Sequence, residues 1–117
     1  IKNTIHKFKK KNLNSKIYAS VGPCIGKKSY EVDIKFYKKF ISKSTKNKIY
    51  FLHRSKSKKL FNLRKFVTDK LKNCKVEVDH VNYDTFIEKN KFFSYRRSCK
   101  LKQKDYGRCI STIRMLN

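Results

Sequence analysis

The fold class is decided by Lys16-Ile17-Tyr18-Ala19-Ser20-Val21-Gly22-Pro23, a strand-like run that stops at a Gly-Pro pair. Gly and Pro at this point end a strand and open a loop, which we expect to run to Tyr30. Beyond the loop, Asp33 can cap a helix with apolar residues at helical spacing. These residues are Ile34, Tyr37, Phe40 and Ile41. A strand, a loop and an amphipathic helix in succession are typical of α/β proteins.

The same alternation of helices and strands extends outward in both directions. The other expected elements are a helix over 2–12, a polar loop over 44–48, a strand over 49–52, a basic hairpin-like connection over 54–59, a helix that begins at Asn62, a strand over 75–79 that continues to Val81, a helical or irregular segment over 84–90, a strand over 92–96, a polar loop over 98–105 and a strand over 108–115. The pattern predicts an α/β fold, with a mixed sheet flanked by helices. At 117 residues without an internal repeat, the expected organisation is one domain over 1–117.

The net charge of +24 is the most unusual bulk property, and it raises the alternative of a small basic nucleic-acid-binding protein. Of the 32 basic residues, 26 are Lys and only 6 are Arg, and the lysines are spread along the whole chain. Arg is the residue that recognises bases and phosphates in a fixed geometry. Abundant Lys, Asn, Ile and Phe also follow A/T-rich codons. We therefore expect weak, salt-sensitive and nonspecific polyanion binding.

The cysteines and histidines show no zinc-type spacing and no disulfide framework. They are Cys24, Cys74, Cys99, Cys109, His6, His53 and His80. Reduced thiols favour a cytoplasmic location, and no apolar run is long enough for a transmembrane helix, so no membrane partner is expected. The chain begins at Ile1 inside a helical pattern, which indicates a domain cut upstream.

The candidate site lies around Phe92-Phe93-Ser94-Tyr95-Arg96-Arg97, which Tyr106-Gly107-Arg108 follows. Guanidinium groups suit phosphate and carboxylate oxygens. In a strand, Ser94 and Arg96 would share one face and Tyr95 and Arg97 the other, so only one arginine of the pair can face a given pocket. The alternative is a core strand that ends in two solvated or salt-bridged arginines.

Two further residues could carry chemistry. Cys24, in the loop Gly22–Gly26, could be a nucleophile if a base lowered its pKa, but a buried inert thiol is the favoured interpretation. Glu31 could be an acid or base, but a carboxylate in the first turn of the following helix is favoured.

Taken together, these motifs resemble the C-terminal half of the YfiH/laccase-domain family. The matching segments, in order, are V-G-P-C-I-G at 21–26, Y-E-V at 30–32, D-T at 84–85, F-F-S-Y-R-R at 92–97 and Y-G-R at 106–108. The resemblance covers about residues 1–116. It implies a YfiH-like α/β fold, of which 1–117 is the C-terminal portion. Members were labelled multicopper polyphenol oxidases and are now regarded as purine nucleoside phosphorylases with adenosine deaminase activity, acting on adenosine, inosine or methylthioadenosine.

The resemblance also sets expectations for cofactor and substrate. Family members bind zinc or copper through a His in V-H-G, a Cys in A-D-C and a His in H-A-G-W, and none of these motifs occurs here. The metal ligands are therefore expected upstream, with no metal bound and no turnover by this chain alone. The positions that match the family's substrate cleft are Ser94, Tyr95, Arg96, Arg97 and Arg108. We expect Arg96 or Arg97 to hold phosphate or purine nucleoside, and Arg108 to support its turn.

Overall fold

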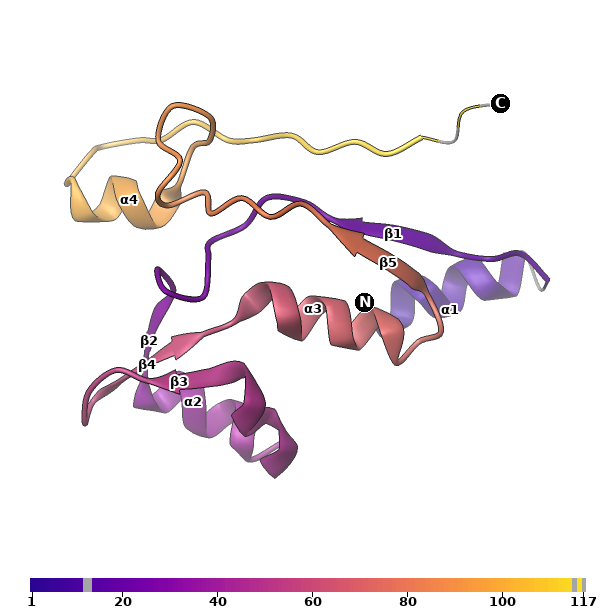
Figure 1. The fold of residues 1–117 in the computed structure, drawn as a ribbon, viewed down its shortest axis with the longest axis horizontal. Helices are drawn as coiled ribbons and strands as arrows, with labels where there is room; N and C mark the ends of the chain where they lie inside the picture. The colour runs from indigo at the N-terminus through magenta and orange to yellow at the C-terminus, as the bar shows by residue number, and fades with distance from the viewer. Residues whose placement is uncertain (12–13, 115, 117) are drawn as a thin grey trace.

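The structure, a computed structural model, describes residues 1–11, 14–114 and 116. Its elements, in order, are α1 (Lys2–Lys11), β1 (Tyr18–Val21), β2 (Glu31–Asp33), α2 (Ile34–Ile41), a 3₁₀ helix η1 (Thr45–Tyr50), β3 (Phe51–His53), β4 (Lys58–Phe61), α3 (Leu63–Lys72), β5 (Glu77–His80) and α4 (Tyr95–Lys100). One sheet is parallel and the other antiparallel, and helices flank both (Figure 1). The predicted α/β class is confirmed.

The parallel pair β1–β5 forms one half of the molecule. Its register runs from Tyr18 opposite Glu77 to Val21 opposite His80. Helix α3 supplies the crossover to β5 and lies against both strands (Figure 1). The strands predicted from the Gly-Pro stop and from the alternation at 75–79 are thus confirmed, and they pair with each other.

The antiparallel sheet, in the order β2-β4-β3, forms the other half and packs against α2. Its core is aromatic, and Phe61 is only 1% exposed. Around Phe61 lie Tyr30, Val32, Phe36, Phe40, Tyr50, Phe51, Leu63 and Phe66. Ring pairs such as Phe40–Phe61 at 5.1 Å show that these side chains interlock. Of the apolar stripe predicted for the helix after Asp33, Phe40 packs on this core and Tyr37 contacts Phe51, while Phe36, which the stripe did not include, also packs on the core.

Both predicted helix caps are present. The Asp33 carboxylate accepts a hydrogen bond from the Phe36 amide at 2.7 Å. The Asn62 side chain accepts one from the Lys65 amide at 3.1 Å. These contacts satisfy amides that the first turn of a helix leaves without a partner. They fix where α2 and α3 begin.

The segment between α2 and β4 differs from the sequence prediction. The loop expected over 44–48 is largely the helix η1, and the strand expected over 49–52 is shortened to Phe51–His53. Asn47 explains part of the difference, because its buried amide donates to the Phe40 carbonyl at 2.8 Å and ties this segment to α2. The hairpin-like connection is confirmed, but β4 was not predicted. Two lysines at its start conceal the apolar pattern.

The strand expected over 92–96 is wrong. Ser94 ends the extended segment and caps α4, with its hydroxyl accepting from the Arg97 amide at 3.3 Å. The aromatic residues before Ser94 favour a strand by propensity, but the cap starts a helix in the middle of the motif. The loop expected over 98–105 therefore begins as the last turns of α4.

The closing strand expected over 108–115 is also wrong for the described residues 108–114. No strand pairing is present there, and Met115 lies outside the described residues. Figure 1 shows this segment, in yellow, running past β1 without joining the sheet. Ile110 and Ile113 are 89% and 71% exposed. The apolar pattern is real, but no neighbouring strand in the described chain covers it.

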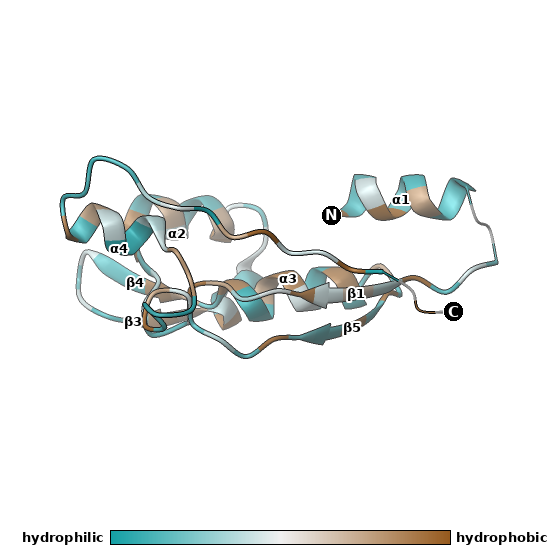
Figure 2. Cartoon of the chain, turned by 90° about the horizontal axis from the view of Figure 1, so that it is seen from above, coloured by the Kyte–Doolittle hydropathy of each residue, from teal (hydrophilic) through white to brown (hydrophobic). Residues whose placement is uncertain are grey.

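The first helix confirms the prediction for residues 2–11, while residue 12 lies outside the described residues. It stands at one end of the molecule and is mostly hydrophilic (Figure 2). Ile5 is its one buried residue, and Lys9 donates to the Cys74 carbonyl at 2.7 Å. No helix in the described ranges is both long and apolar enough to cross a lipid bilayer.

Candidate functional site

A cleft of about 560 Å³ brings the loop at 23–30 together with residue 85 and the stretches 93–96 and 106–109. We call it the Arg96 cleft. Its lining residues are Pro23, Ile25, Tyr30, Thr85, Phe93, Ser94, Tyr95, Arg96, Tyr106, Gly107, Arg108 and Cys109. Four of the five predicted site residues are among them, and Arg97 is not.

Arg96 is the arginine of the pair that faces the cleft. It lies in the first turn of α4, and its guanidinium carbon is 5.4 Å from the centre of the Tyr30 ring. Within the described residues, no carboxylate lies at ion-pair distance from Arg96. Stacking on an aromatic ring orients a guanidinium without using its N–H groups. Those groups are therefore available to an anion.

Arg97 has a structural position. Its Nη1 donates to the carbonyls of Thr85 and Phe86 at 2.8 and 2.9 Å, and its Nη2 donates to the Phe92 carbonyl. These contacts fasten α4 to the turn that contributes Thr85 to the cleft. The strand geometry expected for the motif was wrong, but the expectation that its two arginines diverge agrees with this arrangement.

The remaining wall of the Arg96 cleft is aromatic. The rings of Tyr95 and Tyr106 are 5.1 Å apart, and the Arg108 guanidinium carbon lies 4.8 Å from the centre of the Tyr106 ring. Hydrogen bonding to the neighbouring Cys99 thiol raises the pKa of Tyr95 above its ordinary value. Gly107 has to be small here, because an added Cβ would lie 2.4 Å from the Phe93 ring.

The loop after β1 is held by Asp84. Burial alone would raise the pKa of this carboxyl, but hydrogen bonds from the Ser29 hydroxyl and from the Gly26, Phe86 and Ile87 amides outweigh it and lower the pKa. The Ser29 hydroxyl lies 2.6 Å from Asp84. An added Cβ at Gly26 would lie 2.3 Å from the Asp84 carboxylate. Asp84 and Gly26 therefore fit against each other and fix the wall that carries Ile25.

The two other candidate residues lie outside the Arg96 cleft. Burial raises the pKa of Cys24, even though the charge of Arg64 acts in the opposite direction, and this favours the inert thiol over the nucleophile. Glu31 is not in the first turn of α2, as was expected, but in β2. It forms ion pairs with Arg54 at 3.6 Å and Lys58 at 3.9 Å.

The described residues do not offer a fitting metal site. No group of three or more His, Cys, Asp or Glu side chains comes together in residues 1–11, 14–114 and 116. Burial raises the pKa of Cys24, the cysteine inside the loop motif, whereas a metal ligand must be a thiolate. Among the residues that the structure describes, the donor set therefore does not fit the zinc or copper that the resemblance implies.

Sequence reasoning did not assign Tyr30 and Thr85 to the site. Both residues stand inside the quoted motifs, Y-E-V and D-T, and that membership was the one available signal. Their roles depend on long-range packing, because Tyr30 supports Arg96 and Thr85 is placed by Arg97. The arrangement as a whole offers two guanidinium groups, several aromatic rings and a hydroxyl, which suits a ligand with both an anionic and a planar part.

Comparison with known proteins identifies relatives over nearly the whole chain. Residues 1–116 match the family described as multi-copper polyphenol oxidoreductase laccase. A purine nucleoside phosphorylase of Rickettsia conorii is 37% identical over 98% of this chain and 48% of its own length. A purine nucleoside phosphorylase of Haemophilus influenzae is 39% identical over 69% of this chain and 34% of its own length.

Solved structures agree with the fold. The Bacillus licheniformis hypothetical protein YfiH superposes with a TM-score of 0.73 over 83% of this chain and 39% of its own, at 19% identity. A Neisseria meningitidis protein, described with the family DUF152, has a TM-score of 0.60 at 28% identity, over 64% of this chain and 31% of its own. The chain spans about half the length of the Rickettsia relative. The family match over residues 1–116 shows that the chain belongs to the multi-copper polyphenol oxidoreductase laccase family.

Proposed function

We propose that the protein acts as a purine nucleoside phosphorylase and that this chain supplies the cleft that holds phosphate beside the nucleoside. The observation that carries the proposal is the Arg96 guanidinium, which has no carboxylate partner among the described residues and stands in an aromatic cleft. The relatives from Rickettsia and Haemophilus, which bear the name purine nucleoside phosphorylase, support it. The proposed substrates are adenosine, inosine and methylthioadenosine.

In phosphorolysis, a phosphate oxygen forms a bond to C1′ of the sugar while the C1′–N9 bond breaks. The bonding electrons go to the purine, which takes up a proton. A guanidinium pair can hold the attacking phosphate through charge-assisted hydrogen bonds, and base–aromatic stacking contributes about 1–3 kcal/mol. We assign phosphate to Arg96, with Arg108 as the second cation at the cleft. Tyr95 and Tyr106 offer stacking surface for the purine.

Ser94 and Arg97 are positioning residues in this proposal. The Ser94 hydroxyl caps α4, and Arg97 fastens α4 to residues 85 and 86. Together they set where Arg96 stands relative to Tyr30. Arg108 stacks on Tyr106, and this contact supports the proposal that it also holds its own turn.

Adenosine deamination, a zinc or copper ion bound by residues outside this chain, and a cytoplasmic location remain predictions from the resemblance and from cysteine usage. The described side chains offer no donor set for such an ion, so the roles above use none. The alternative of a nucleic-acid-binding protein is not favoured by the relatives. Weak polyanion binding remains the expectation from the net charge.

The test is Arg96→Leu in the full-length protein, assayed for phosphorolysis with phosphate as the varied substrate. We expect the KM for phosphate to rise about tenfold or more, because a charge-assisted contact is lost. Arg114→Leu is the matched control, since it removes the same charge from an exposed position outside the cleft. An unchanged phosphate KM in Arg96→Leu would exclude the assigned role.

A further inference from the structure

A second cleft, of about 540 Å³, lies between α3, the loop after β1 and the segment after β5. We call it the Arg64 cleft. It shares no lining residue with the Arg96 cleft, although the loop after β1 and the segment after β5 contribute residues to both clefts. Gly26 and Asp84 face the Arg64 cleft, whereas Ile25 and Thr85 face the Arg96 cleft.

The Arg64 cleft carries an excess of positive charge. Lys27, Lys28, Arg64 and Lys72 line it, and among the described residues no carboxylate lies within ion-pair distance of any of them. Lysines are common all over this chain, so their presence alone does not distinguish this face.

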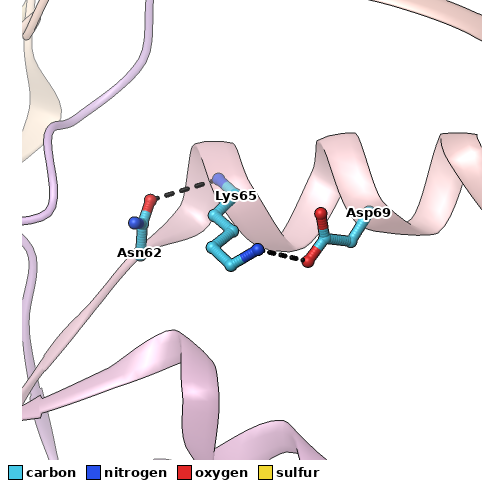
Figure 3. A network of polar contacts seen from close by, with 3 residues as sticks. All are labelled: Asn62, Lys65 and Asp69. Carbon is cyan, nitrogen blue, oxygen red and sulfur yellow. Dashed lines mark hydrogen bonds and ion pairs between the residues drawn. The ribbon is translucent and has the colours of Figure 1, made fainter.

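Both acids of the cleft are already engaged. The Asp69 carboxylate accepts from the Lys65 ammonium at 2.9 Å, next to the Asn62 cap (Figure 3). Asp84 accepts from the Ser29 hydroxyl at 2.6 Å and from the Phe86 amide at 2.9 Å. The cations outnumber these two carboxylates, because Lys27, Lys28, Arg64, Lys65 and Lys72 all line the cleft, so its net charge is positive.

Two unpartnered donors distinguish this cleft from the rest of the surface. Arg64 is fixed by Nη1, which donates to the Asn82 side chain at 2.9 Å, and by Nη2, which donates to the Tyr83 carbonyl. Its buried Nε has no hydrogen-bond partner, although the guanidinium lies close enough to the Cys24 thiol to oppose the effect of burial on that thiol's pKa. Thr68 is only 9% exposed, and its hydroxyl has no partner either. In the described chain, these are the buried side-chain polar atoms left without a partner, and both residues line this one cleft.

The two donors belong to one face of α3. Residues four apart on a helix are neighbours on its surface, so Arg64 and Thr68 lie one turn from each other. A buried polar group without a partner is costly in a folded protein, and such a group is explained when a ligand satisfies it. An N–H and an O–H on one helix face, surrounded by ammonium groups, can satisfy the oxygens of a tetrahedral anion.

We propose that the Arg64 cleft is a second anion site, which binds the phosphate group of a nucleotide-sized molecule. Arg64 Nε and the Thr68 hydroxyl are buried in this structure, so binding requires a small shift of both side chains toward the cleft, where phosphate oxygens accept hydrogen bonds from them and Lys27, Lys28 and Lys72 neutralise the charge. A phosphate carries more charge and more acceptor oxygens than a carboxylate, which suits this number of donors. The volume exceeds what one phosphate fills and lies in the range of small-molecule sites.

The experiment is calorimetric titration of the full-length protein with inorganic phosphate and with ADP. Both titrations are made in the Arg96→Leu background, so that the Arg96 cleft does not contribute. We expect Thr68→Val to weaken binding about tenfold and the triple variant Lys27→Gln, Lys28→Gln, Lys72→Gln to weaken it further. The matched control, Lys35→Gln, Lys38→Gln, Lys43→Gln, removes the same charge from exposed positions around α2 and should change the affinity by less than about twofold.

The possible results separate clearly. Tighter binding of ADP than of phosphate, with both sensitive to Thr68→Val, identifies a nucleotide as the source of the phosphate group. Equal affinities identify free phosphate. Equal weakening by the two triple variants, no effect of Thr68→Val, or no binding in the Arg96→Leu background would each overturn the second site. Circular dichroism of each variant shows whether it is folded. The test is independent of phosphorylase activity.

Discussion

Arg96 and Arg97 are adjacent residues of the same type with opposite environments. Arg97 directs its guanidinium at three backbone carbonyls, whereas Arg96 stacks on Tyr30 at the edge of a cleft. A planar fork can reach several acceptors at once, and an ammonium group cannot hold the same geometry. The chemistry of the two residues is therefore set by the direction in which α4 presents them.

We expect Arg97→Lys to lower the free energy of unfolding by about 1–3 kcal/mol, because partly buried carbonyls lose their donors. Urea unfolding followed by circular dichroism measures the change. Arg96→Lys is the control, and it should stay within about 0.5 kcal/mol of the parent, since Arg96 forms no hydrogen bond among the described residues. Equal losses in the two variants would contradict the structural role of Arg97.

Asp84 gives a prediction for pH dependence. Its pKa in the folded state lies below the usual 3.8, so the carboxylate stabilises the fold at neutral pH. This contribution is present above the unfolded-state pKa and is lost as the pH falls through the folded-state pKa. Asp84→Asn should therefore be less stable than the parent at pH 7, and the difference should shrink below about pH 4.

The measurement is urea unfolding across the acid range. Ser29→Ala is the companion variant, because it removes one donor to Asp84 and leaves the charge in place. It should reduce the pH-dependent part of the stability without abolishing it. A stability difference for Asp84→Asn that is the same at every pH would show that the ionised carboxylate contributes nothing.

At the scale of elements, α4 depends on its cap. The hydroxyl of Ser94 accepts from the Arg97 amide, and α4 has only six residues, so one cap is a large part of its stability. Ser94→Ala should cost about 1 kcal/mol and should also raise the phosphate KM, because Arg96 loses its fixed position. Ser94→Thr keeps a hydroxyl cap and should recover most of both losses.

Unfolding by urea and the phosphate KM are both needed to test this element. A loss of stability without a change in KM would mean that α4 holds Arg96 in place even without its cap. A change in KM that Ser94→Thr does not recover would point to a contact between the Ser94 hydroxyl and the substrate.

The sequence predicted elements whose signals are local. Asp33 and Asn62 mark helix starts by side-chain chemistry, and the Gly22-Pro23 stop marks the end of β1. The errors fall where the deciding contact is distant or where two signals compete. Ser94 was predicted to lie in a strand because aromatic residues precede it, but it caps a helix. The apolar alternation over 108–114 predicts a strand, but it does not show whether a neighbouring strand is available to pair with that segment.

The difference between local signals and distant contacts also explains which parts of the site the sequence predicted. The motifs around Ser94 and Arg108 predicted where the cleft residues lie, since both segments line it. The choice between Arg96 and Arg97 depends on how α4 packs on Tyr30, which is more than 60 residues upstream, and on Thr85, which is 12 residues before Arg97. Residue type and spacing contain no information about that packing.

At the scale of the whole molecule, the chain is flat and open. Its radius of gyration is 16.5 Å and its extents are 47 × 37 × 22 Å, whereas about 13 Å is typical for a compact domain of this length. Few apolar residues are fully buried, and Phe61 is the most buried of them. This shape agrees with a chain that spans about half the length of its Rickettsia relative.

The net charge of +24 predicts that salt stabilises the folded state. The ion pairs, such as Lys16–Glu77 at 3.4 Å, are exposed and worth at most about 1 kcal/mol each, so their loss in salt is small. Repulsion among the many lysines is relieved at the same time. We expect Tm to rise by several degrees between about 0.02 and 0.5 M NaCl, as measured by thermal unfolding. A Tm that falls with salt would show that the ion pairs dominate.

The parallel pair β1–β5 adds a consequence for how the chain behaves in solution. Within residues 1–11, 14–114 and 116, each of these strands has one edge with no backbone partner, and such edges are templates for pairing between molecules. At low ionic strength the lysines keep two molecules apart. Added salt removes that barrier while it stabilises the fold, so thermal stability and colloidal solubility should move in opposite directions.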